Sequence, residues 1–152
     1  MGRRLAPAEA LSLVPQREPF RFVDEIHELD EEHAVGSYRW RPEADFYRGH
    51  FPGDPVTPGV LLVECMAQAG VVPLAIHLFY LEMGDDEAAK TLPFFTDASV
   101  DFSGVVRPGE LVRVESQRVF YRRRKLRVEA EMTLEDGTVV CAGRLSGMGV
   151  SR

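Results

Sequence analysis

The sequence predicts an α+β domain in which an antiparallel sheet wraps around one long central helix. An apolar run of helical length spans Val60–Met83, and the chain after it alternates apolar and polar residues with the period of two that strands show. A helix that is apolar all round is buried, and a strongly twisted sheet can bury it by curling around it. The length of 152 residues is that of one domain, spanning residues 1–152.

Before the central helix we expect a short helix and a hairpin. The short helix covers Leu5–Val14 and ends before a proline. Pro19–Ile26 and Ala34–Arg41 are typical of strands, with a turn at residues 30–32 between them. Asp45–Pro58 contains so many glycines and prolines that we expect neither helix nor strand there, but a shaped loop.

From the central helix to the C-terminus we expect a meander of strands. Pro73 should kink or interrupt the helix because proline lacks the N–H that a helix needs, and Gly84–Glu87 ends it. The strands cover Leu92–Val106, Leu111–Tyr121, Leu126–Leu134 and Val139–Leu145, with a hairpin turn at Glu135–Thr138. One helix cannot cover both faces of so wide a sheet, so an outer face or an edge is a candidate for self-association.

Charge and cysteine content exclude several classes of protein. A net charge of -6 argues against general nucleic-acid binding. Cys65 and Cys141 are too few for a disulfide framework, and we expect them to be buried, reduced thiols in a cytoplasmic protein. The N-terminus lacks a secretory pattern. Val60–Leu81 contains Glu64 and His77, which are costly inside a bilayer, so we expect no membrane insertion.

No metal and no cofactor are expected from the motifs. His27, His33 and His77 lack the spacing of metal ligands, and no Cys-x-x-Cys is present. Phosphate loops and dinucleotide fingerprints are likewise missing from the sequence.

A base, an acid and an oxyanion donor fall within 15 residues of one another. His50 lies in the proline-rich loop, and histidine titrates near neutral pH. Gly59 opens the helix, whose first amides lack intrahelical acceptors and favour a developing negative charge. Glu64 follows one turn later with Gln68 on the same face, and burial raises the pKa of such a carboxyl, as a general acid needs. The set fits proton abstraction beside a carbonyl with protonation of a leaving group, although a lone loop histidine is more often structural than catalytic.

These residues resemble a known family. Gly49–Gly53, Pro58–Leu61, and Glu64 with Met66–Gln68 are similar to the signature of bacterial (3R)-3-hydroxyacyl-[acyl-carrier-protein] dehydratases of the FabZ/FabA type. Weaker likenesses in the flanks extend the resemblance over about residues 11–146. It implies a hot-dog fold, a homodimer or a trimer of dimers, and active sites that take the histidine from one subunit and the acid from the other.

The resemblance also implies a role for each site residue. His50 would remove the C2 proton of the thioester, and Glu64 would assist departure of the 3-hydroxyl as water. The Gly59 amide would hold the thioester carbonyl, Gln68 would orient Glu64, and the Val56 carbonyl would fix the tautomer of His50. No cofactor takes part.

The sequence is compatible with both branches of the family and with more than one contact surface for the carrier protein. Glu64 resembles the FabZ branch, whereas Asp54–Val56 and Phe102–Gly104 resemble the FabA branch, so accompanying isomerisation of the double bond is undecided. An acidic acyl carrier protein would present the substrate, and the candidates for contacting it are Arg107 and Arg122–Lys125, the latter also readable as a solvated hairpin turn. A hot-dog thioesterase and a non-catalytic binder of acyl carriers are the alternatives.

Overall fold

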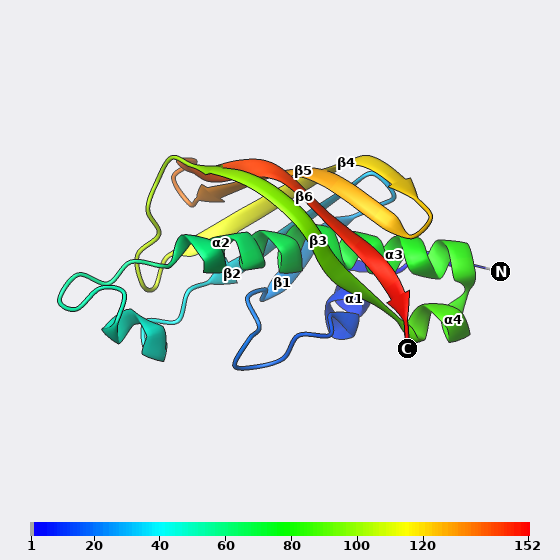
Figure 1. Cartoon of the computed structure of the whole chain (residues 1–152), viewed down its shortest axis with the longest axis horizontal. Coiled ribbons are helices and arrows are strands. Elements are labelled where there is room, and N and C mark those ends of the chain that lie inside the picture. The colour runs from blue at the N-terminus through cyan, green and yellow to red at the C-terminus, as the bar shows by residue number, and fades with distance from the viewer. Residues whose placement is uncertain (1) are drawn as a thin grey trace.

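The computed structural model describes residues 2–152 and contains a six-stranded antiparallel sheet that curls over a long helix (Figure 1). The strands are β1 (Glu25–Leu29), β2 (His33–Arg39), β3 (Thr91–Phe102), β4 (Leu111–Arg122), β5 (Lys125–Leu134) and β6 (Val139–Ser151). Their order in the sheet is β1-β2-β4-β5-β6-β3, and all neighbours are antiparallel. The predicted architecture is therefore confirmed, with β1 and β3 as the two edges.

The central helix occupies the hollow of the sheet as one continuous element from residue 59 to residue 83. It consists of α2 (Gly59–Met66), a π-turn (Ala67–Val71) and α3 (Val72–Met83). Its length and composition would suffice to cross a membrane, but 72% of its most apolar stretch is buried inside the chain. It is therefore packed like the core helix of a globular domain, in one apolar cluster with the inward side chains of the strands.

Pro73 interrupts the regular hydrogen bonding of the helix without ending it. In the π-turn just before it, the amide of Val72 donates to the carbonyl of Ala67, five residues back. Ser116 of β4 supports the turn, because its hydroxyl donates to the carbonyl of Gly70 at 2.8 Å. The predicted effect of Pro73 is thus confirmed as a local widening of the helix, a form that is frequent at functional sites.

The strand predicted over Pro19–Ile26 is wrong for most of its length, since β1 begins only at Glu25. The backbone of the preceding residues pairs with a side chain of the helix instead of a strand. The amide of Phe22 donates to Oε1 of Gln68 at 2.6 Å, and Nε2 of Gln68 donates to the carbonyl of Phe20 at 3.1 Å. This segment is a strap across the central helix.

Other element bounds differ in smaller ways. The first helix, α1, is shorter than predicted at Pro7–Leu13, and Asp45–Arg48 forms a turn of 3-10 helix inside the segment expected to be irregular. The glycines and prolines of that loop begin only at residue 49, which leaves room for the turn. A further helix, α4 (Asp85–Ala89), follows Gly84, and β6 runs six residues beyond its predicted end at residue 145.

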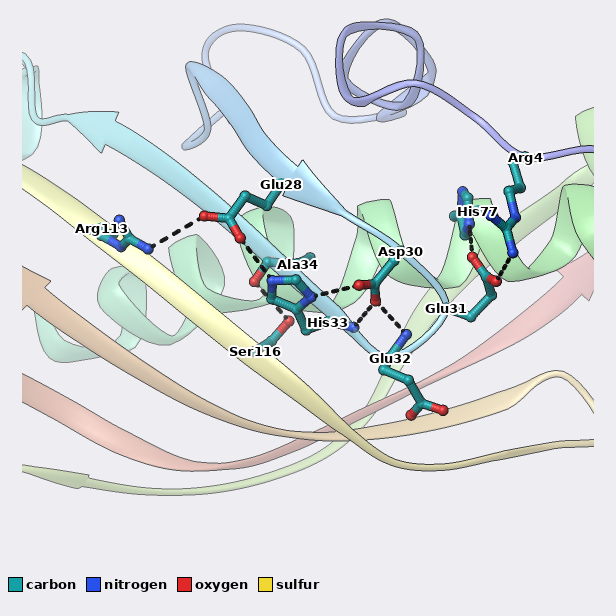
Figure 2. A network of polar contacts seen from close by, with 10 residues as sticks. All are labelled: Arg4, Glu28, Asp30, Glu31, Glu32, His33, Ala34, His77, Arg113 and Ser116. Atoms are coloured by element: carbon teal, nitrogen blue, oxygen red, sulfur yellow. Dashed lines mark hydrogen bonds and ion pairs between the residues drawn. The ribbon is translucent and has the colours of Figure 1, made fainter.

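A buried histidine ties the N-terminal segment and the β1–β2 turn to the central helix (Figure 2). His77 of α3 is 1% exposed, and its Nδ1 accepts a hydrogen bond from the amide of Leu5 at 3.2 Å. Because Nδ1 accepts, the ring proton is on Nε2, which donates to Glu31 at 3.1 Å. Glu31 also pairs with Arg4 at 2.7 Å. The hydrogen bond from His77 is the main cause that lowers the pKa of Glu31.

Candidate active site

His50 lies on a short loop that holds its ring in one orientation. Val56 closes the loop, because its amide donates to the carbonyl of His50 at 2.9 Å and its own carbonyl is 2.9 Å from Nδ1 of the ring. A carbonyl can only accept, so Nδ1 carries the proton and Nε2 keeps its lone pair. The Val56 contact expected from the sequence is therefore present, and Nε2 is the basic nitrogen.

Contacts with the rest of the fold fasten this loop at its base. The amide of Thr57 donates to the carbonyl of Val106 at 2.8 Å, and the Thr57 hydroxyl lies 2.7 Å from that of buried Tyr47. Arg107 forms an ion pair with Asp54 at 2.7 Å. Arg107, a candidate for contact with a carrier protein, thus has a partner within the chain.

Glu64 lies in α2, half-buried, with Gln68 one turn further along the helix. Nε2 of Gln68 donates to Oε2 of Glu64 at 2.8 Å. Burial is the main influence on this carboxyl and raises its pKa, while the hydrogen bond from Gln68 opposes the rise. Glu64 therefore holds a proton to higher pH than an exposed glutamate, as expected for a general acid.

Glu64 opens into a cavity of about 280 Å³ between the central helix and strands β3 and β6. Apart from Glu64, Gln16 and Ser146 its walls are apolar, and they include Phe20, Phe94 and Phe95. Such walls suit a hydrocarbon chain. Sequence reasoning missed these wall residues; the only signal in the sequence is an aromatic pair in a strand of weak alternation.

His50 does not line the cavity that holds Glu64. Its ring stacks on that of Phe51, with ring centroids 4.1 Å apart, in the loop that precedes α2 (Figure 1). Gly59, the first residue of α2, is also outside the cavity walls, and a side-chain carbon there would lie 3.2 Å from the ring of Phe102. Within one chain, His50 and Gly59 therefore lie outside the cavity that Glu64 lines.

The edge strand β3 runs beside the cavity and has an unpaired side. It is 12 residues long, and Phe94, Phe95 and Phe102 are each more than two-fifths exposed. A long, apolar, unpaired edge is a template for pairing with another chain. The expectation of a self-associating edge is compatible with this geometry.

The other residues that the sequence analysis considered lie in a hairpin turn or in the buried core. Arg122–Lys125 forms the β4–β5 hairpin turn, with Arg123 and Arg124 in the left-handed conformation that such turns use. Within residues 2–152 no group of three or more His, Cys, Asp or Glu side chains is arranged to hold a metal ion. Cys65 and Cys141 are unpaired and buried, and burial raises the pKa of both thiols.

The fold is that of a hot-dog protein, with a histidine in the loop before the central helix and a half-buried glutamate inside the helix, and the comparisons with known proteins agree with this class. Residues 14–144 match the model of the FabA-like domain. The chain is 37% identical over 137 residues to the 3-hydroxyacyl-[acyl-carrier-protein] dehydratase FabZ of Caldicellulosiruptor saccharolyticus, covering 89% of this chain and 91% of that one. It is 39% identical over 136 residues to the enzyme of the same name from Desulfotalea psychrophila, covering 87% and 85%.

Solved structures carry the same fold. The dehydratase heterocomplex ApeI:P of Xenorhabdus doucetiae superposes with a TM-score of 0.77 at 17% identity, covering 98% of this chain and 94% of that one. A thioesterase of Haemophilus influenzae superposes with a TM-score of 0.67 at 13% identity, covering 99% and 94%. At these identities the likeness shows the fold alone. The sequence matches show more: the chain belongs to the FabA-like family and is a hot-dog dehydratase of the FabZ type.

Proposed function

We propose that the chain dehydrates (3R)-3-hydroxyacyl thioesters of an acyl carrier protein to trans-2-enoyl thioesters, with His50 as the base and Glu64 as the acid. The reaction class follows from the family, in fatty-acid or related acyl-chain biosynthesis. The residue roles rest on the geometry of this chain. The observation that carries them is a half-buried carboxyl with a raised pKa at an apolar cavity.

In the proposed elimination Nε2 of His50 takes the C2 proton. The electron pair of the C2–H bond forms the double bond between C2 and C3, and the C3–O bond breaks. Glu64 gives its proton to the departing hydroxyl, which leaves as water. The Gly59 amide, unpaired at the start of the helix, would stabilise negative charge on the thioester oxygen. No metal or cofactor takes part in this scheme.

The complete site would combine two subunits of a homodimer. His50 lies outside the cavity of Glu64 in its own chain, and the free edge of β3 borders that cavity. Pairing of two β3 edges would cover Phe94 and Phe95 and bring the partner's loop to the cavity. A trimer of such dimers is compatible with this arrangement.

The carrier protein would approach a surface with available cations. Arg107 is paired with Asp54 and Lys125 with Asp97, so the arginines of the β4–β5 turn, Arg122–Arg124, are the better candidates. Carrier proteins are acidic, and complementary charge speeds docking. The unpaired, buried cysteines suit the reducing cytoplasm, where we expect the enzyme to act.

The experiment that tests the proposal follows (3R)-3-hydroxybutanoyl and crotonyl thioesters by ultraviolet absorbance and mass spectrometry. Wild-type protein should interconvert them, and His50→Ala should lose the activity while its circular dichroism stays native. Wild-type-like rates in His50→Ala would overturn the residue assignment. Release of free thiol in place of water exchange would identify a thioesterase, and binding without turnover would identify a non-catalytic carrier-binding protein.

A further inference from the structure

We infer that Val72 and Pro93 form a partition that ends the acyl cavity, and that this enzyme therefore selects short and medium acyl chains and excludes long ones. The inference rests on the proposed function, because it takes the cavity at Glu64 to be the site of the acyl chain. It adds a specificity determinant to that site.

Two cavities lie in succession along the central helix. The first, at Glu64, has Ala67, Val71 and Val72 as its helical wall. The second, of about 520 Å³, begins one helical turn later, with Ile76 and Tyr80 as its helical wall. From Glu64 to Val72 the helix advances by about 12 Å at 1.5 Å per residue. A chain that starts at Glu64 and follows the helix thus meets Val72 at the far end of the first cavity.

Pro93 of β3 is the one residue of the strand that lines both cavities. Val72 belongs to the first cavity only and Ile76 to the second only. The boundary between the two cavities therefore lies between Val72 and Ile76 on the helix and at Pro93 on the strand. Val72 is 4% exposed, so its side chain is held in packed surroundings and does not swing aside freely.

The π-turn accounts for the position of Val72. A π-turn takes more residues per turn than an α-helix, so the residues after it are rotated back around the helix axis. This rotation brings Val72 toward the face that carries Glu64 and Ala67. On the opposite wall, a side-chain carbon at Gly147 would lie 3.2 Å from Cγ1 of Val71, so β6 approaches the helix closely at this point. Pro73 is thus the origin of a helical bulge that closes the cavity.

Hydrocarbon binding gives the partition a measurable signature. Burial of one methylene is worth about 0.8 kcal/mol, or about a fourfold gain in affinity. Affinity should rise by about this factor per methylene while the first cavity fills, and then stop rising or fall at the partition.

The test compares 3-hydroxyacyl pantetheine thioesters from butanoyl through octanoyl and dodecanoyl to hexadecanoyl. For each we would measure kcat/KM with wild type, Val72→Ala and the matched control Val128→Ala. Val128 is equally buried and lines neither cavity. Binding of the same series to the His50→Ala variant, and to His50→Ala combined with Val72→Ala, would be measured by calorimetry.

Wild type and Val128→Ala should favour butanoyl and octanoyl substrates over hexadecanoyl by at least tenfold. Val72→Ala should raise kcat/KM and affinity for dodecanoyl and hexadecanoyl chains tenfold or more relative to those for butanoyl. Equal preference for all lengths in wild type, or an unchanged profile in Val72→Ala, would overturn the partition. If the wild type dehydrates none of these substrates, the proposed function is wrong. The binding measurements with the His50→Ala variants would still show whether affinity stops rising at Val72, and so would test the partition independently.

Discussion

The side-chain amide of Gln68 forms hydrogen bonds both with Glu64 and with the backbone of Phe20 and Phe22, in the segment that crosses the central helix. Its Oε1 accepts from the amide of Phe22 at 2.6 Å, which fixes the orientation of the group, so that Nε2 donates to Oε2 of Glu64 at 2.8 Å. The carbonyl oxygen of a neutral carboxyl is the better acceptor, so this bond favours the form of Glu64 that carries its proton on Oε1. In the proposed mechanism, Gln68 would thereby leave Oε1 of Glu64 to give its proton to the departing hydroxyl.

Gln68→Ala should therefore change the pH dependence of dehydration. The hydrogen bond from Gln68 lowers the pKa of Glu64 against the stronger effect of burial, so its loss raises that pKa further. Because the reaction needs protonated Glu64, activity falls as pH rises through this pKa, and the alkaline limb of the kcat profile should move to higher pH. The exposed Gln117→Ala is the control. An alkaline limb that stays in place or moves to lower pH would contradict the account.

The buried contact between Tyr47 and Thr57 should matter for both stability and turnover. Tyr47→Phe removes a hydroxyl that supports the base of the His50 loop and leaves a buried partner without its hydrogen bond, at a cost of about 1–3 kcal/mol. We expect a lower Tm and a severalfold lower kcat, measured by thermal unfolding and steady-state kinetics. An unchanged kcat would show that the loop needs no such anchor.

His77→Leu should destabilise the fold by about 1–3 kcal/mol, because the amide of Leu5 is left buried without an acceptor. Denaturant unfolding measures this loss, and kcat of the folded enzyme should stay near that of wild type. The hydrogen bond lowers the pKa of Glu31, so its contribution is present above the unfolded pKa of about 4.3 and lost as pH falls through the folded value. The difference in the free energy of unfolding between wild type and His77→Leu should therefore become smaller in acid. A difference that becomes larger in acid would contradict the hydrogen bond between His77 and Glu31.

A charge on the free edge of β3 should prevent dimerisation. Ala98 is exposed on this edge and does not line the acyl cavity, so Ala98→Lys changes the edge without altering the cavity walls. Light scattering should report a smaller particle than wild type, with a drop in kcat/KM of tenfold or more. Val119→Lys places the same charge on β4, away from the edge, and should leave both unchanged. A dimer that survives Ala98→Lys with full activity would rule out this edge as the interface.

The sequence was sufficient for the central helix and the long strands because their apolar patterning is strong. It failed at Pro19–Ile26, where apolar residues suggest a strand but the backbone bonds to Gln68, a contact between segments 46 residues apart. It indicated His50, Gly59, Glu64 and Gln68 as site candidates, since loop breakers and a carboxylate in an apolar helix are visible as local patterns, whereas Val56 followed only from the resemblance to the dehydratases. Their roles in the reaction stay predictions. The cavity walls formed by β3 and β6 depend on tertiary packing, which local patterns do not encode.

The central claim is that the base and the acid of each site come from different subunits. His50→Ala and Glu64→Gln should each be inactive alone, and the two variants would be co-expressed with different tags, mixed dimers purified, and dehydration measured. A mixed dimer holds one complete site out of two, so it should recover about half of the wild-type activity. Mixed dimers as inactive as the two parent variants would contradict the shared site. They would show that the His50 and Glu64 of each active site come from the same subunit.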